Sequence, residues 1–291
     1  MSVAGQSYLL FDGVLRGQLL PWLYLQDEPL EVEPLYACTP WRELADIGPV
    51  LVQPLSPNGL IMNFEGDPTL QACASVLRSK ASIAAVADHL RQFIEVSDTL
   101  GSASLLRFAD PLVAQHWLAS YGPQALSAVL GPIDDWRMAA HRARWQNRQH
   151  TEWLSFHSSE PTTSSSPFRL SHLEESQIQA LEQAYQRRFA DRLDSWLEQA
   201  VPDFREALGS RWGDWLTGQY QAAQAWGLTT ERSIAIWLEL HARLGDGVCS
   251  AEEGRYAVWL TDNPHMKRVP PDARIQAFEA DFLNCQQKGL S

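Results

Sequence analysis

The first half of the chain carries its apolar residues in short runs that end at glycine, proline, asparagine or aspartate. Runs of this length with such boundaries are typical of β-strands. The pattern predicts strands over Tyr8–Phe11, Pro49–Leu55, Gly59–Phe64, Cys73–Leu77 and Ala103–Phe108. We interpret them as a mixed sheet.

Two helices are expected between and after these strands. From Ile83 to Ile94 the apolar residues recur every three or four positions, which makes one stripe along a helix that Ser82 can cap. A second helix begins at Asp110 and Pro111, because the carboxylate can accept free backbone N–H groups and proline suits the first helical position.

The pattern changes at the segment SSEPTTSSSP, where small polar residues and proline replace every apolar period. Beyond it the apolar spacing is helical and predicts five helices packed as a bundle. The expected fold class is therefore α+β, with an α/β lobe and an all-α lobe. Its boundaries are a first domain at 1–157, a linker at 158–167 and a helical domain at 168–291.

The amino-acid composition agrees with two domains and reduces the number of possible functions. A chain of 291 residues with 45% hydrophobic and 20% charged residues can form two ordinary globular domains. The four cysteines are far apart and form no C-x-x-C pair, so we interpret them as reduced packing residues. No cofactor or metal is expected.

The net charge of -12 repels a phosphate backbone, and acidic residues outnumber basic ones in both halves, so we expect no nucleic-acid partner. The N-terminal residues lack the basic and apolar regions of a signal peptide, and no apolar run is long enough to span a membrane. We therefore expect a cytoplasmic protein that does not bind membranes.

The common catalytic motifs are absent from the sequence, including G-x-S-x-G, H-E-x-x-H and the phosphate-binding glycine loops. The stretch from His141 to His157 holds three histidines and Glu152, but gaps of nine, two and five residues do not suit a metal site. We interpret it as a solvated basic segment. An enzyme such as a hydrolase remains the least favoured class.

One polar cluster has a strong physical argument. Alternation along the predicted strand places Arg107 in an apolar setting, and a buried guanidinium needs a carboxylate. Asp110 and Asp12 are the candidates, with Arg91 as a further member of the network. We interpret the cluster as a structural lock and not as an active site.

Twelve tryptophans beside only three lysines is an unusual balance, since tryptophan is enriched at protein interfaces. In the helical lobe Trp212 and Trp215 share one helical face, and Trp226 follows three turns later on nearly the same face. These three tryptophans are candidates for the wall of a partner-binding groove. The alternative is that all of them belong to the core.

The segments YLLFDG, GPVLVQPL, HLRQF, LLRFADP and GPI follow one another between about residues 7 and 136. Their order resembles the N-terminal domain of the type VI secretion effector-chaperone family. The segment AWGLTTERSIAIWLELHARLG is similar to the helical C-terminal lobe often found in that family.

The resemblance implies a non-enzymatic adaptor that binds one effector, keeps it soluble and loads it onto the VgrG or PAAR tip of the secretion spike. It places the family motif on Asp12, Arg91, Arg107, Asp110 and Pro111 as determinants of the first-lobe fold. Leu112 stands where family members often carry a second arginine. An immunity protein or another inhibitory binder is the competing class.

Overall fold

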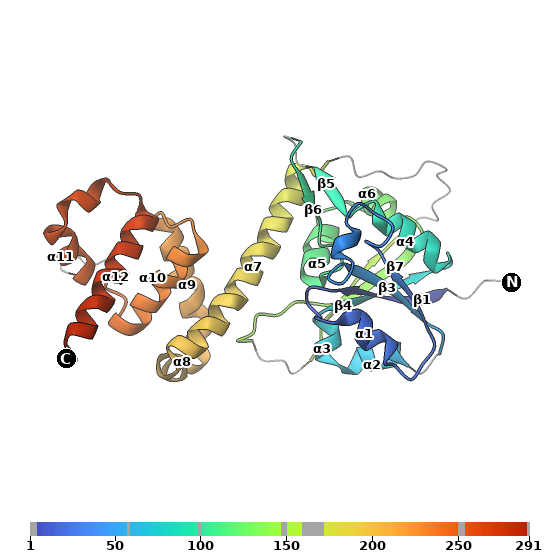
Figure 1. The fold of residues 1–291 in the computed structure, drawn as a ribbon, viewed down its shortest axis with the longest axis horizontal. Coiled ribbons are helices and arrows are strands. Elements are labelled where there is room, and N and C mark those ends of the chain that lie inside the picture. The colour runs from blue at the N-terminus through green and yellow to red at the C-terminus, as the bar shows by residue number, and fades with distance from the viewer. Residues whose placement is uncertain are drawn as a thin grey trace. The chain divides into compact units, whose positions relative to one another are not determined.

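The computed structural model describes residues 5–56, 59–97, 101–146, 150–158, 172–249 and 254–289. The chain divides into two compact units, each with its own core (Figure 1). The first unit comprises residues 1–142 and 148–186, and the second comprises residues 143–147 and 187–291. Helix α7 (Glu175–Ala200) gives its first turns to one unit and its remainder to the other.

The first unit is built on a six-stranded sheet of order β2-β3-β1-β4-β7-β8. Its strands are β1 (Gln6–Asp12), β2 (Leu30–Pro34), β3 (Pro49–Pro54), β4 (Ala74–Ser79), β7 (Ile133–Ala139) and β8 (Trp153–His157). The predicted α+β class is confirmed with one correction: every pairing is antiparallel, where we expected a mixed sheet. The apolar pattern locates strands but carries no information on their direction.

Two layers of helices cover the two faces of this sheet (Figure 1). Alternate residues of β1 supply both cores, because successive side chains point to opposite faces: Leu9 and Phe11 join one, and Tyr8 and Leu10 the other. The first face packs against α1 (Leu19–Tyr24), α2 (Leu60–Gly66) and α3 (Pro68–Gln71). The second packs against α4 (Ile83–Arg91), α5 (Pro111–Ala119) and α6 (Pro123–Leu130).

The two helix starts predicted in this unit are confirmed. The Ser82 hydroxyl accepts the Ala85 N–H at the start of α4. The Asp110 carboxylate accepts the Leu112 N–H at 3.0 Å, and Pro111 opens α5.

The strand predicted over Gly59–Phe64 is wrong, because this segment forms α2. Leu60 and Phe64 lie four positions apart and are both buried, which is the spacing of one helical face. The Leu60 N–H, left free at the helix start, donates to the carboxylate of Glu28. A six-residue segment is compatible with strand or helix, and here the contact with Glu28 caps the helix.

The strand predicted over Ala103–Phe108 is shorter than expected. Strand β6 (Ala103–Leu105) pairs only with β5 (Glu95–Ser97) in a separate two-stranded ribbon. Arg107 therefore lies in the turn before α5 and not in the main sheet.

The second unit is a helical bundle, as predicted. After α7 it contains α8 (Pro202–Leu208), α9 (Trp212–Ala225), α10 (Glu231–Leu244), α11 (Arg255–Asp262) and α12 (Pro271–Gly289). The five helices predicted from the sequence count α8 and α9 as one, whereas the structure separates them. Gly209, at φ +50, separates them, because the left-handed conformation that glycine readily adopts ends the first helix.

The division between the units differs from the expected domain boundary. Of the predicted linker at 158–167, only Ser158 is among the described residues. The sequence assigned the start of α7 to the helical lobe, yet Leu173, Ile178 and Leu181 pack with the core of the first unit. In the described part of the chain, none of the helices is both long and apolar enough to cross a membrane.

Candidate functional site

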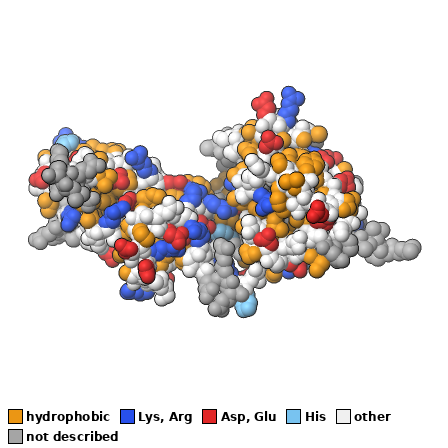
Figure 2. Space-filling model, turned by 60° about the horizontal axis from the view of Figure 1, so that its bottom comes forward, with side chains coloured by type: hydrophobic (Ala, Val, Ile, Leu, Met, Phe, Trp, Pro, Cys, Tyr) orange, Lys and Arg blue, Asp and Glu red, His pale blue; other side chains and the backbone are white. Residues whose placement is uncertain are grey.

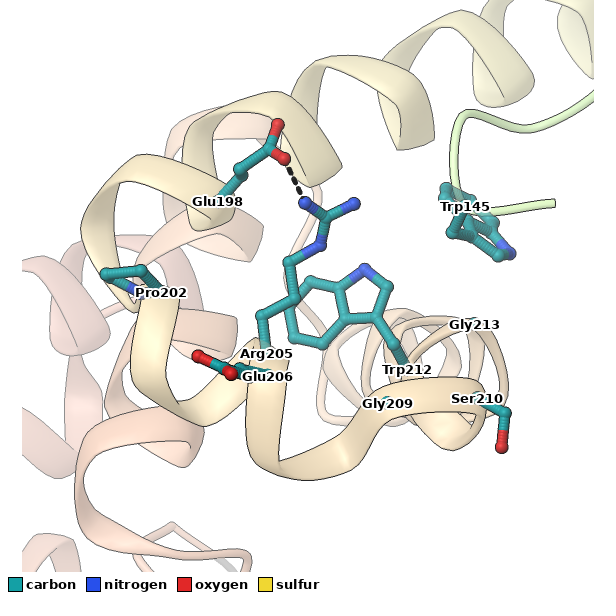
Figure 3. A pocket seen from close by; sticks show the side chains of 9 residues that line it. All are labelled: Trp145, Glu198, Pro202, Arg205, Glu206, Gly209, Ser210, Trp212 and Gly213. Atoms are coloured by element: carbon teal, nitrogen blue, oxygen red, sulfur yellow. Dashed lines mark hydrogen bonds and ion pairs between the residues drawn. The ribbon is translucent and has the colours of Figure 1, made fainter. Parts of the chain in front are cut away.

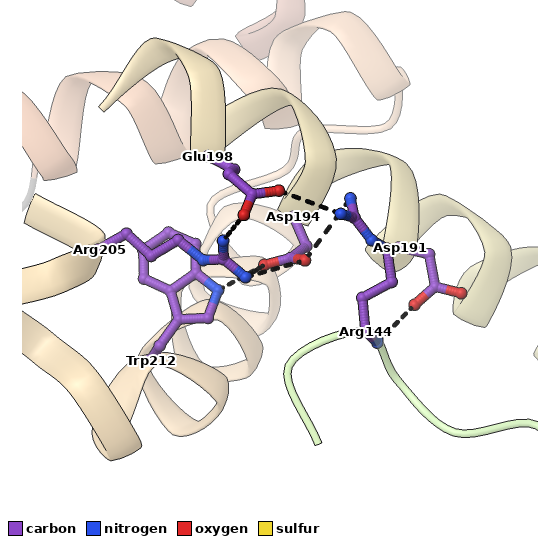
Figure 4. Close-up of polar contacts among 6 residues, drawn as sticks. All are labelled: Arg144, Asp191, Asp194, Glu198, Arg205 and Trp212. Atoms are coloured by element: carbon purple, nitrogen blue, oxygen red, sulfur yellow. Dashed lines mark hydrogen bonds and ion pairs between the residues drawn. The ribbon is translucent and has the colours of Figure 1, made fainter. Parts of the chain in front are cut away.

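A buried carboxylate organises the second unit. Asp194 of α7 has no exposed surface and accepts the indole N–H of Trp212 at 2.6 Å (Figure 4). Arg205 of α8 lies 3.2 Å away, and Arg144 lies 3.8 Å away. Two guanidinium groups and an indole N–H thus compensate the buried charge, as a carboxylate removed from water requires.

A second carboxylate extends this network one turn further along α7. Glu198 forms ion pairs with Arg205 and, at 3.0 Å, with Arg144. The hydrogen bond and charge of Arg205 hold the pKa of Glu198 below its ordinary value. Asp191 accepts the backbone N–H of Arg144 at 3.3 Å. Spacings of three and four residues place the three acids on one helical face.

Beside this network lies an open pocket of about 410 Å³ (Figure 3). Its lining combines indole rings, a proline, two glycines and a few polar side chains: Trp145, Glu198, Pro202, Arg205, Glu206, Gly209, Ser210, Trp212 and Gly213. All of these residues belong to the second unit.

Trp145 forms one wall of the pocket and depends on a glycine. Its indole ring is half-buried against α9, where a Cβ atom added to Gly213 would lie 2.4 Å from the ring. No side chain larger than hydrogen fits there unless the ring moves. Trp145 comes from the loop between β7 and β8, and Arg144 beside it holds the same loop on α7.

The chemistry of the pocket suits binding. The guanidinium of Arg205 is paired with Asp194 and Glu198. The carboxylate of Glu206 is exposed and has no polar partner among the described residues. The lining, as far as the structure describes it, holds no histidine, cysteine or lysine. Apolar rings beside a free carboxylate can hold an apolar or cationic side chain.

The three tryptophans singled out from the sequence lie in two separate ring clusters. Trp212 lines the pocket but is only 3% exposed, and it stacks on half-buried Trp215 at 5.3 Å. Trp226 packs instead against Trp237 and Tyr256, with ring centroids at 5.4 and 5.3 Å. The structure thus brings Trp212 and Trp215 together and places Trp226 elsewhere.

Sequence reasoning missed Trp145 and Glu206. Trp145 lies within the stretch interpreted as a solvated basic segment, and its contact with Gly213 joins distant parts of the chain. A tryptophan within a polar stretch was the available signal. Glu206 carried none, because a surface glutamate on a helix is common.

In the first unit the structure brings together Asp12, Arg107 and Asp110. The guanidinium of Arg107 donates to both carboxylate oxygens of Asp12, at 2.9 and 3.2 Å, and lies 3.4 Å from Asp110. Burial disfavours its charge, but the hydrogen bond and attraction to Asp12 raise the pKa of Arg107. The carboxylates are 4% and 1% exposed.

Arg91 is not part of that cluster. It pairs with Glu33 and, at 2.7 Å, with Asp88, and its Nε donates to the Leu35 carbonyl. It therefore ties α4 to the edge strand β2. The prediction that Arg91 joins the network of Arg107 is therefore wrong.

The described ionisable side chains between His141 and His157 form separate pairs. Glu152 pairs with Arg142 and His157 with Asp135. Among the residues with described positions, no three His, Cys, Asp or Glu side chains are grouped to hold a metal ion.

Comparison with known proteins bears on the first unit directly. Residues 7–128 match the family described as "Domain of unknown function (DUF4123)". The matched domain covers less than half of the chain. This domain runs from β1 into α6 and includes Asp12, Arg91, Arg107, Asp110 and Pro111.

A second similarity extends over both units. The chain is 25% identical over 267 residues to "Accessory protein VasW" of Vibrio cholerae serotype O1 (strain ATCC 39315 / El Tor Inaba N16961), which covers 88% of this chain and 80% of that protein. No solved structure matches. The DUF4123 and VasW similarities confirm the resemblance to the type VI effector-chaperone family.

Proposed function

We propose that this protein is a type VI secretion adaptor that binds an effector in the cytoplasm and loads it onto a VgrG or PAAR spike component. The alignment with VasW carries the proposal, because it covers 88% of the chain and so includes the helical unit as well as the DUF4123 domain. The name of that relative, "Accessory protein VasW", agrees with an adaptor role.

We further propose that the pocket of the second unit contacts the effector. Trp145 and Pro202 offer apolar surface, while Arg205 and Glu198 neutralise each other at the rim. Interfaces combine such an apolar centre with a polar border, and tryptophan is prominent among the residues that dominate binding. Trp212 lines the pocket, and Trp215 stacks on the Trp212 ring from outside the lining.

The test is the affinity of the purified chain for its effector, measured by calorimetry for two tryptophan variants. Trp145→Ala removes a pocket wall, and we expect it to weaken binding about tenfold or more. Trp196→Ala is the control, since Trp196 is 38% exposed but does not line the pocket. Equal affinities for the two variants would remove the pocket from the interface.

Trp226 remains a candidate for a separate contact. Its ring packs against Trp237 and Tyr256 and under the guanidinium of Arg274 at 5.1 Å, so Trp226→Ala should lower the melting temperature. A partner role is supported only if the conservative Trp226→Phe melts like the wild type and binds the effector more weakly.

A further inference from the structure

The first unit leaves four large apolar side chains exposed near one another. Tyr24 and Leu25 at the end of α1 are 76% and 79% exposed, Leu55 after β3 is 57% exposed, and Met62 of α2 is 60% exposed. We call these four residues the α1–α2 patch. Single exposed apolar residues are normal, but a group of them marks an interaction surface.

Two contacts hold the segments of the patch together. The Leu55 N–H donates to the Pro29 carbonyl at 3.0 Å, and the Leu60 N–H donates to Glu28. Glu28 and Pro29, a few residues after Tyr24 and Leu25, therefore contact the start of α2 and the residue after β3. Figure 2, which brings the underside of Figure 1 forward, shows hydrophobic side chains gathered on this unit.

The patch is not a misplaced part of the core. Helix α1 already buries Leu19 and Leu23, and α2 already buries Leu60 and Phe64, each pair four residues apart. Both helices thus complete the sheet's core with one face and present further large apolar residues on another. Folding of the unit does not account for these exposed side chains.

The segments that carry the patch have an excess of acidic residues, although Arg91 pairs with Glu33 and Arg137 with Glu65. Residues 17–34 and 49–77 contain no lysine, arginine or histidine, but six acidic residues: Asp27, Glu28, Glu31, Glu33, Glu65 and Asp67. The nearby Arg16 lies over the Trp22 ring at 3.8 Å. A complementary partner surface must be apolar and basic.

We propose that the α1–α2 patch docks an apolar segment of a partner protein that is flanked by lysine or arginine. A second copy of this chain would bring two acidic borders together, and an anionic membrane would be repelled in the same way. The α1–α2 patch is thus a second docking surface beyond the proposed function. It lies in the first unit, whereas the tryptophan pocket lies in the second.

The probe is a synthetic amphipathic helix of about 18 leucine and lysine residues, or about five turns, titrated into the full chain and followed by fluorescence anisotropy. A matched peptide with glutamate in place of lysine tests the charge. We expect the lysine peptide to bind and the glutamate peptide not to. The double variant Leu25→Glu and Met62→Glu should weaken binding of the lysine peptide about tenfold or more.

The double variant also separates docking on the patch from general electrostatic attraction between the acidic protein and the lysine peptide. Two added carboxylates strengthen general attraction for a cationic peptide, whereas they disrupt docking on an apolar patch. Val258→Glu is the control, since Val258 is 56% exposed in the second unit, and it should bind the lysine peptide like the wild type. Asp27→Asn should reduce the salt dependence of binding.

Undiminished binding by the double variant would overturn the proposal. Dimerisation that Leu25→Glu abolishes would make a second copy the occupant, and binding to phosphatidylserine vesicles would favour a membrane; either result contradicts the proposal. Failure here leaves the proposed function intact if Trp145→Ala still weakens effector binding. Conversely, a chain that binds the lysine peptide but no effector retains this inference and loses the proposed function.

Discussion

Arg107 holds two buried carboxylates that come from different parts of the first unit, Asp12 at the end of β1 and Asp110 at the start of α5. Removing the guanidinium takes the ion-pair partner away from both carboxylates while they remain buried. We expect Arg107→Ala to lower the free energy of unfolding by about 3 kcal/mol. This is the lower end of the cost of breaking a buried ion pair. Chemical denaturation with circular dichroism measures it.

A matched surface pair provides the control. Arg192 is 49% exposed and pairs with Glu231, so Arg192→Ala should change the unfolding free energy by about 1 kcal/mol or less. If Arg107→Ala unfolds like the wild type and effector binding is lost, the Arg107 cluster is an interface and its structural interpretation is wrong.

For single residues, the sequence predicts a contact when one physical requirement, such as the pairing of a buried charge, demands it. The rule that a buried arginine needs carboxylates named Asp12 and Asp110 for Arg107, although the structure leaves the Arg107 side chain 38% exposed. The same reasoning placed Arg91 wrongly, because Glu33 and Asp88 satisfy it equally well. Trp145 against Gly213 was not predictable, since no charge or period links these positions.

Helix α9 tests how an element positions the pocket. Gly213 and Gly218 both lie in this helix, and a Cβ atom meets the Trp145 ring at the first and nothing within 4 Å at the second. Gly218→Ala should raise the free energy of unfolding by about 0.5 to 1 kcal/mol through helix propensity. Gly213→Ala should not raise the free energy of unfolding in this way, because the added methyl group displaces the Trp145 ring from α9.

Hydrogen exchange over residues 143–146, combined with thermal melting, measures the effect. We expect faster exchange in Gly213→Ala and unchanged exchange in Gly218→Ala. Unchanged exchange in both variants would show that Trp145 can shift without leaving α9, and would contradict the role given to Gly213.

Element prediction succeeded where the pattern was long and failed where it was short. The stripe of α4 and the long helices of the second unit repeat over several turns, so period alone identifies them. The run Gly59–Phe64 is too short to separate strand from helix, and Glu28 caps the helix from outside the segment.

For the molecule as a whole, each unit contains a buried histidine that should make its stability depend on pH. Burial lowers the pKa of His89 in the first unit and of His241 in the second below the ordinary value of 6.5. The folded state therefore favours the neutral ring. The stabilisation is complete above about pH 6.5 and is lost as pH falls toward the lowered pKa.

Denaturant unfolding between pH 7.5 and 5 checks this behaviour. We expect the free energy of unfolding to fall on acidification, and His241→Gln should make the fall shallower in the second unit's transition. His89→Gln should do the same for the first unit. A pH dependence identical to that of the wild type in both variants would contradict the assignment to these histidines.

The division into two units also shows what the sequence could and could not supply. Composition and the change of apolar period predicted an α+β lobe followed by helices, and the motif order indicated the family. The point of division within α7 was not predictable, because Ile178 and Leu181 continue the same helical stripe as the residues after them while packing with a different core.

As proposed above, this chain would deliver a type VI effector without altering the effector's toxicity. The most direct measurement compares the solubility, secretion and toxic activity of the cognate effector, with and without the chain. We predict that the chain raises solubility and secretion and leaves the toxic activity unchanged. An effector that is inhibited in the complex, or secreted equally well without the chain, would contradict this account.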